Sequence, residues 1–297
     1  MTTTTQPEEP RTWKLTLAYD GTGYRGWQVQ PGQPTIQGEL QAALERVVGE
    51  SPLPQGSGRT DAGVHALAQV ASFALRASIP PGSLVRALNR TLPQSVRVLK
   101  AETVASDFHA RHSAVAKTYE YRVFLERPGP GAPLVCPPFL ARYVFAYPWP
   151  LDLEALEESA RAFLGTQDFL SFAATDPDLA ARSGGSPDPD VAADEQEPGG
   201  PAGAVRTIFG SCWERKPAHE TALFVYRVRG SGFLHHMVRN LVGTMLDVGR
   251  GYRRADEIPA MIAARARAAA GPTAPARGLF LHSVEYEDDP RSATGEL

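Results

Sequence analysis

The sequence predicts an α+β fold in which antiparallel sheets are covered by helices. Several segments alternate apolar and polar residues, which is the pattern of a strand with one buried face. Other segments repeat apolar residues at helical spacing. Few of these segments follow one another as strict β-α-β units, so the strands are expected to pair in antiparallel sheets.

The first half of the chain opens with a strand, because apolar residues alternate over residues 12–19. A helix is expected over residues 36–48, with Thr35 as its N-cap and Gly49 at its C-terminal end. The other elements expected in this half are a strand near 67–75, a short helix near 83–90, and strands near 95–104 and 117–125.

The second half begins with a helix expected over residues 152–164 and closed by Gly165. A strongly periodic helix is expected over residues 233–248, where apolar residues form a broad stripe. Another helix is expected over residues 256–270, with Pro259 in its first turn. Strands are expected near residues 205–214, 222–229 and 279–286.

The composition is typical of a soluble globular protein, with 42% hydrophobic and 21% charged residues in 297. Met1–Pro10 carry no secretory signal pattern, and no apolar stretch approaches the length of a membrane span. The two cysteines, Cys136 and Cys212, form neither a disulfide framework nor a thiolate zinc motif. We therefore expect a cytoplasmic protein without a membrane partner.

The charge is unevenly distributed along the chain. The net charge is −3, but residues 176–204 and 285–297 are strongly acidic. The rest of the chain has 28 bases and 21 acids, a net charge of +7 that is compatible with an RNA partner. Residues 176–204 are rich in Gly, Pro, Ala and Asp without apolar periodicity, which predicts a flexible insertion.

The segment GRTDAGVH at residues 58–65 stands out chemically, because two glycines flank an arginine and an aspartate. Glycines allow backbone conformations that hold a carboxylate in a fixed, exposed position. A guanidinium such as that of Arg59 would keep Asp61 ionised, as a nucleophile requires. An ordinary turn, in which Asp61 bonds to its own backbone, is the alternative.

The string GRTDAGVHALAQV resembles the catalytic signature of the TruA family of tRNA pseudouridine synthases. The resemblance covers roughly residues 13–286, is interrupted mainly by the acidic insertion, and is highly specific because its motifs occur in the expected order. The other motifs are LAYDGTGYRGWQVQPGQPTIQGEL at 17–40, LNRTLPQSVRV at 88–98, FHARHSAVAKTYEYRV at 108–123, LGTQDFLSF at 164–172, GSGFLHHMVRNLVGTMLDVGRG at 230–251 and RGLFLHSVEY at 277–286.

The resemblance implies that Asp61 is the catalytic nucleophile, which attacks either ribose C1′ or uracil C6. It implies that Tyr119 stacks on the uracil and can take part in removing the C5 proton. A core aromatic is the alternative for Tyr119. Arg239 lies on a strongly apolar helix, where an unpaired guanidinium is costly, so we expect it to meet the Asp61 carboxylate; an arginine that points to solvent is the alternative. No cofactor is implied.

The resemblance also implies residues that bind the substrate. Arg59 is expected to handle the flipped base or the adjoining backbone, with a surface ion pair as the alternative. Leu279 is expected beneath the uracil ring, with a plain core leucine as the alternative. Tyr24, Arg25 and Gln28 lie in a glycine-rich loop suited to RNA contacts, although solvated or buried side chains fit as well.

A metal site is not expected. His235 and His236 are adjacent within the predicted helix, where their side chains would point about 100° apart. His109 and His112 lack further ligand candidates in the sequence, and His65 is interpreted as structural.

The family fold implies two ferredoxin-like (RNP-like) subdomains, whose antiparallel sheets flank a basic RNA-binding cleft. The bounds expected for them are 11–108 and 109–289, with disordered tails at 1–10 and 290–297. The family works as a homodimer on tRNA, at uridines 38–40 of the anticodon arm. The alternatives are an RNA-binding module without activity, a synthase acting on another RNA, and a hydrolase using Asp61 with a metal or an activated water.

Overall fold

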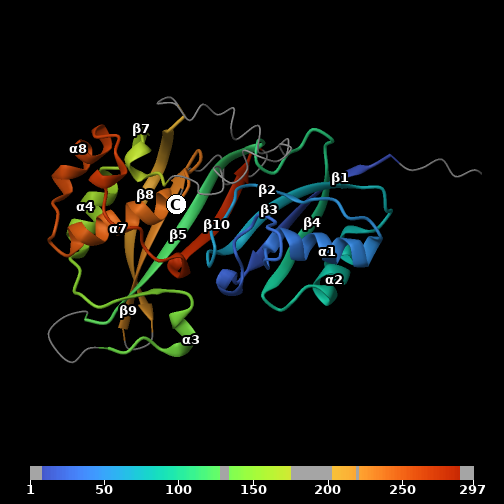
Figure 1. Ribbon diagram of the computed structural model, residues 1–297, viewed down its shortest axis with the longest axis horizontal. Coiled ribbons are helices and arrows are strands. Elements are labelled where there is room, and N and C mark those ends of the chain that lie inside the picture. Colours follow the sequence, from blue (N-terminus) through green and yellow to red (C-terminus); the bar gives the residue numbers. More distant parts are fainter. Residues whose placement is uncertain (1–8, 128–133, 175–202, 219–220, 288–297) are drawn as a thin grey trace, which may run out of the picture. The chain divides into compact units, whose positions relative to one another are not determined.

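The computed structural model describes residues 9–127, 134–174, 203–218 and 221–287 (Figure 1). The chain divides into two compact units. The first contains the residues up to 117 and the segment that begins at residue 279, and the second contains residues 118–278. This division differs from the expected bounds, 11–108 and 109–289. Strand β10 (Leu279–Tyr286) is grouped with the first unit, where it pairs with β3 (His65–Leu75).

The sheet of the first unit has the strand order β4-β1-β3-β10. Strand β1 (Arg11–Tyr19) is antiparallel to both β3 and β4 (Val96–Val104). The short strand β2 (Gln55–Gly56) is antiparallel to β3, whereas β10 is parallel to it. The sheet is thus mostly antiparallel, consistent with the predicted α+β class.

The described residues of the first unit also form two α-helices. Helix α1 (Ile36–Val48) contacts α2 (Pro81–Thr91), and α2 contacts β4 (Figure 1). The bounds of α1 are those predicted, because the Thr35 hydroxyl accepts a hydrogen bond from Gly38 N and Gly49 adopts φ 74°. The core is formed by Trp13, Leu15, Leu17, Leu40, Leu44, Leu84 and Leu88.

The sheet of the second unit has the strand order β5-β9-β8-β7. Its strands are β5 (Ala114–Leu125), β7 (Gly165–Asp168), β8 (Val205–Ala218) and β9 (Thr221–Gly230). Strand β5 belongs to this unit from residue 118 onward. The short strand β6 (Phe145–Tyr147) is parallel to β5. Strand β8 is antiparallel to both β7 and β9.

Helix α4 (Leu153–Arg161) contacts both α7 (Met237–Gly249) and β8 (Figure 1). The other α-helices in the described residues of this unit are α3 (Pro138–Ala141) and α8 (Ile258–Ala263). The core includes Leu156, Phe163, Trp213, Tyr226, Leu241 and Met245.

The predicted helices of the second unit are longer than the observed ones. Helix α7 begins at Met237 rather than at residue 233, because His236 takes a left-handed conformation with φ 58°. The helix expected over 256–270 is limited to α8, and Arg265 at φ 50° turns the chain soon after it. The helix expected over 152–164 ends at Arg161, and Gly165 follows with φ 90°.

Some expectations fall on residues outside the described ranges. These are the tails at 1–8 and 290–297 and nearly all of the acidic insertion 176–204, of which only residues 203 and 204 are described, in a turn before β8. Within the described ranges, no helix has both the length and the apolar character that a membrane crossing requires.

Candidate active site

Residues 57–64, which we call the Asp61 loop, connect β2 to β3 in the first unit. The loop begins against Gln69, a fully buried residue of β3. The side-chain oxygen of Gln69 accepts a hydrogen bond from Ser57 Oγ at 2.7 Å, and its Nε2 donates to the Gly58 carbonyl at 2.9 Å. One amide side chain therefore fixes the first two residues of the loop to the sheet.

The middle of the Asp61 loop is held at Thr60, the residue before the aspartate. The Thr60 hydroxyl lies 2.8 Å from the Tyr19 hydroxyl, and the Thr60 carbonyl accepts a hydrogen bond from Trp27 N at 3.0 Å. Burial raises the pKa of Tyr19 to about 12, against the opposing effect of its hydrogen bonds to Thr60 and Gln69. Tyr19 therefore stays neutral and can keep this bond at physiological pH.

Residues 20–28, which we call the Tyr24 loop, fit closely against the Asp61 loop. Gly63 N donates to the Tyr24 carbonyl at 3.3 Å. Gly26 has φ 95°, and a Cβ atom at this position would lie 2.5 Å from the Thr60 carbonyl oxygen. A Cβ at Gly21 would lie 2.0 Å from the Val64 carbonyl oxygen. Only glycine permits this approach at both ends of the loop.

The Asp61 loop ends at His65, the first residue of β3. The His65 ring is buried and stacks on Phe280 of β10, with centroids 4.7 Å apart. Its Nδ1 lies 3.1 Å from Gly21 N and 3.2 Å from Asp20 Oδ1. These contacts join the two loops and two strands of the first unit, as the structural interpretation of His65 anticipates.

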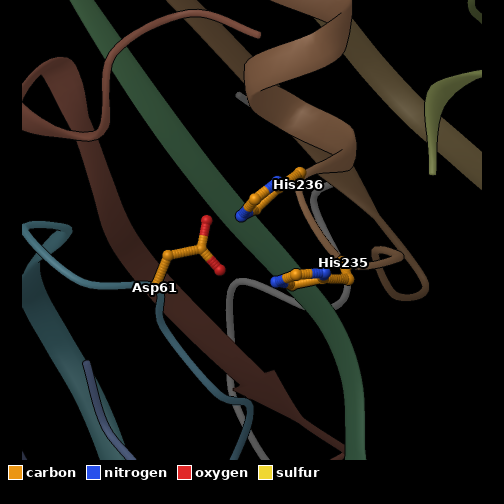
Figure 2. Close-up of side chains that lie close together, drawn as sticks. All are labelled: Asp61, His235 and His236. Atoms are coloured by element: carbon orange, nitrogen blue, oxygen red, sulfur yellow. The ribbon is translucent and has the colours of Figure 1, made fainter. Parts of the chain in front are cut away.

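Asp61 is half-buried, between the buried Thr60 and the exposed Ala62. Its carbonyl accepts a hydrogen bond from Val64 N at 3.1 Å, which closes a turn. Figure 2 shows the carboxylate projecting from the loop. The aspartate thus combines a backbone fixed on both sides with a side chain that is not sealed in the core. Arg59 is half-buried in the same loop.

The other predicted site residues of the first unit differ in exposure. Tyr24 is half-buried and its hydroxyl lies 2.8 Å from Ser95 Oγ, whereas Arg25 is exposed and Gln28 is half-buried. Because backbone hydrogen bonds join the Tyr24 loop to the Asp61 loop, these three residues lie near the Asp61 loop. Leu279 is buried at the start of β10, and Trp27 is a core residue beneath Gly56.

Tyr119 and Arg239 belong to the second unit. Tyr119 lies on β5 with 8% of its surface exposed, and its ring meets Phe233 edge-on at 5.0 Å. Arg239 is half-buried in the first turn of α7, and its Nε donates to the Ala274 carbonyl at 2.8 Å. The backbone N of Ala274 in turn donates to the Arg239 carbonyl at 3.1 Å. The guanidinium is thus anchored to the protein through Nε.

Sequence reasoning missed Asn240, which organises the segment that anchors Arg239. Asn240 is fully buried, and its Nδ2 donates to the Phe172 carbonyl at 2.6 Å. Its Oδ1 accepts hydrogen bonds from Arg267 Nη2 at 3.0 Å and Thr273 Oγ1 at 2.7 Å. The signal available in the sequence was an asparagine within the apolar stripe of a helix, where it needs buried partners.

His235 and His236 lie before helix α7, not within it. The centroids of their rings lie 3.9 Å apart, with an interplanar angle of 32°. Figure 2 shows the two side chains close together. The sequence-based argument that helical geometry separates the two side chains is therefore wrong. The expectation that no metal is bound loses this argument and stays a prediction.

These features define a mixed α/β protein that presents a half-buried aspartate on a rigid loop. The family model described as tRNA pseudouridine synthase matches residues 16–113 and 189–287. The chain belongs to this family.

Individual relatives agree with the family match. The chain is 48% identical over 275 residues to a protein of Solibacter usitatus named tRNA pseudouridine synthase A; the alignment covers 92% of this chain and 98% of the relative. Proteins of the same name from Moorella thermoacetica and Lacticaseibacillus casei are 42% and 41% identical over 275 residues, covering 92% of this chain and 98% and 99% of the relatives.

Proposed function

We propose that the chain is an isomerase that converts uridine to pseudouridine in tRNA, at positions 38–40 of the anticodon arm, with Asp61 as the nucleophile. The observation that carries this proposal is the rigid, half-buried Asp61 loop within the segment matched by the family model. The tRNA is the substrate, and no cofactor takes part.

The reaction breaks the N1–C1′ glycosidic bond, rotates the uracil, and forms a C5–C1′ bond. Asp61 supplies the carboxylate that adds to ribose C1′ or to uracil C6 and is released again, so the net change is an isomerisation with loss of the C5 proton to solvent and protonation at N1. A preorganised carboxylate suits this role because little reorganisation is needed when the nucleotide arrives.

The target nucleotide leaves its base stack to react, so aromatic and apolar surfaces must receive it. We assign stacking on the uracil to Tyr119 and packing beneath it to Leu279. We assign the orientation of the Asp61 carboxylate to the guanidinium of Arg239, whose Nε is anchored on the Ala274 carbonyl. Arg59, together with Tyr24, Arg25 and Gln28 of the Tyr24 loop, contacts the RNA.

The proposal also covers the subdomain fold, the oligomeric state and the cellular location. We infer that the two units are ferredoxin-like subdomains flanking a basic cleft, that the enzyme acts as a homodimer, and that it works in the cytoplasm. The net charge of +7 outside the acidic segments supports binding to a polyanion.

Asp61→Asn tests the nucleophile, because the amide keeps the shape of the side chain but not its nucleophilic oxygen. We expect isomerisation to be abolished and the affinity for tRNA to stay within a few fold of wild type. The measurement is tritium release from uridine labelled at C5, together with pseudouridine mapping in tRNA from cells that carry only the variant. Asp107→Asn, an exposed aspartate of the same unit, is the matched control. Retained turnover in Asp61→Asn would remove the nucleophile assignment.

Arg239→Ala tests the orientation of the carboxylate. We expect severely reduced turnover, with Arg161→Ala as an exposed arginine control from the same unit. Near-normal rates would refute the pairing. Two measurements separate the alternatives. An inactive RNA-binding module releases no tritium from uridine labelled at C5. A metal-dependent hydrolase loses its activity when EDTA is added.

A further inference from the structure

A stack of two aromatic rings around a guanidinium lies at the C-terminal end of α7. The guanidinium carbon of Arg250 is 4.2 Å from the ring centroid of Trp149 and 4.3 Å from that of Tyr252. We call these three residues the Trp–Arg–Tyr stack. Trp149 keeps 40% of its surface exposed and Tyr252 keeps 67%. Arg127 approaches Trp149 from elsewhere in the unit, at 5.7 Å.

The backbone holds this stack in a fixed arrangement. Arg250 N donates to the Leu246 carbonyl at 3.0 Å, which ends the helix, and Tyr252 N donates to the Asp247 carbonyl at 2.9 Å. Gly251 between them has φ 82°, a conformation that turns the chain back so that residues 250 and 252 lie on the same side. Asp152 N donates to the Gly249 carbonyl at 2.8 Å, which ties the chain after Trp149 to the same helix end.

The position of Arg250 alone has an ordinary explanation, since a cation at a helix C-terminus interacts favourably with the helix dipole. The dipole does not explain two large exposed rings beside it. Exposed aromatics interleaved with guanidinium groups form surfaces on which nucleobases stack, while the positive charge attracts the phosphates. Arg253 and Arg254 follow in the chain, so the segment from 250 to 254 contains three arginines and no acid. Asp247 and Asp256 partly neutralise the last two.

The stack is well separated from Arg239. The two arginines are eleven positions apart in one helix, which is about 16 Å along its axis. A single flipped nucleotide cannot span this distance, so the stack would meet a different nucleotide of the same RNA.

We propose that the Trp–Arg–Tyr stack binds an unpaired nucleotide of tRNA other than the target uridine. This inference rests on the proposed function, which makes tRNA the substrate. An RNA occupant is favoured over a second protein copy because a guanidinium, not an apolar side chain, occupies the centre of the patch. The contact contributes to substrate affinity and takes no part in the chemical step.

The experiment compares Trp149→Ala and Tyr252→Ala with wild type on two substrates, full-length tRNA and the isolated anticodon stem-loop. Stacking predicts that each variant raises the KM for full-length tRNA about tenfold. The kcat for full-length tRNA stays unchanged. A KM that rises for both substrates places the bound nucleotide in the anticodon arm, and a KM that rises for full-length tRNA alone places it elsewhere; both results support the inference. Tyr252→Phe keeps the ring and retains wild-type KM. Phe139→Ala, which removes a 92% exposed aromatic from the same unit, is the matched control and leaves KM unchanged.

Unchanged KM for full-length tRNA in both alanine variants overturns the inference, as does an equal rise in KM in Phe139→Ala. A change in oligomeric mass in Trp149→Ala or Tyr252→Ala, measured by light scattering, also overturns it and assigns the patch to protein contacts. Failure of the proposed function is recognised separately. In that case wild type isomerises neither substrate, while direct binding measurements still show whether the alanine variants lose full-length tRNA.

Discussion

At the scale of single residues, two glycines of the Tyr24 loop have opposite surroundings. A Cβ at Gly26 would lie 2.5 Å from the Thr60 carbonyl, in a backbone conformation with φ 95°, whereas a Cβ at Gly23 would meet nothing within 4 Å. Gly26 therefore sets how closely the Tyr24 loop approaches the residue before Asp61. Gly23 has no such role.

Gly26→Ala is expected to shift the Asp61 loop and destabilise the protein by about 2 kcal/mol or more, since the left-handed conformation alone costs an L-residue about 1–2 kcal/mol. Catalysis should fall more than the stability loss explains, because a small displacement of a catalytic group is costly. Urea unfolding and kcat for tRNA check both effects. Gly23→Ala should match wild type in both measurements, and equal behaviour of the two variants would contradict the account.

At the scale of elements, strands β5 and β9 are joined by a buried carboxylate between two arginines. Glu120 accepts hydrogen bonds from Arg122 Nε at 2.7 Å and from Arg227 Nε at 3.0 Å. Burial alone would raise the pKa of Glu120, but the hydrogen bonds and charges of Arg122 and Arg227 outweigh it and lower the pKa below its ordinary value. The ionised form of Glu120 is therefore more stable in the folded protein than in the unfolded chain.

A depressed carboxyl pKa gives stability that is present above the unfolded pKa, about 4.3, and is lost as the pH falls through the folded value. Glu120→Gln should thus lower the melting temperature at pH 7, because it leaves the two guanidinium groups without their counter-charge. The difference from wild type should shrink as the pH is lowered towards 3. Glu154→Gln, an exposed glutamate of α4, is the control. A difference that is constant with pH would show that the ionisation of Glu120 contributes nothing to stability.

Elements also show how far the sequence could predict the structure. Helix α1 was predicted with its observed bounds because Thr35 and Gly49 mark its ends chemically. The start of α7 was not, because the apolar pattern continues through Leu234 while the left-handed backbone of His236 leaves no mark in that pattern. The network around Asn240 depends on Arg267 and Thr273, which lie 27 and 33 residues away. Single-sequence periodicity carries no information on such partners.

At the scale of the whole molecule, the Asp61 loop could be singled out from the sequence, but the assignment of strand β10 to the first unit could not. Residues 58–65 carry a local glycine pattern, whereas the parallel pairing of Phe280 with His65 joins segments with no local signal in common. Besides this pairing, β10 places Tyr286 against Phe108, and the Tyr286 hydroxyl donates to the Ala110 carbonyl at 2.7 Å. The first unit is therefore incomplete without it.

A fragment of residues 9–117 is expected to lack a cooperative unfolding transition, because its core and the edge of β3 are exposed. A fragment in which residues 277–287 follow residue 117 through a flexible Gly/Ser linker should fold. Thermal unfolding followed by near-UV circular dichroism compares the two. A linked fragment whose 277–287 segment has Phe280 and Tyr286 replaced by serine is the control. Cooperative unfolding of the short fragment would contradict the assigned role of β10.

The late position of β10 in the chain has a consequence for protein synthesis. Residue 117 leaves the ribosome 162 positions before residue 279, an interval of roughly ten to thirty seconds at ordinary rates of translation. During this time the nascent polypeptide already contains Asp61 but lacks β10, the strand that pairs with β3 in the sheet of the first unit. A growing chain should therefore be unable to modify nucleic acid within reach until residues 279–286 have been synthesised.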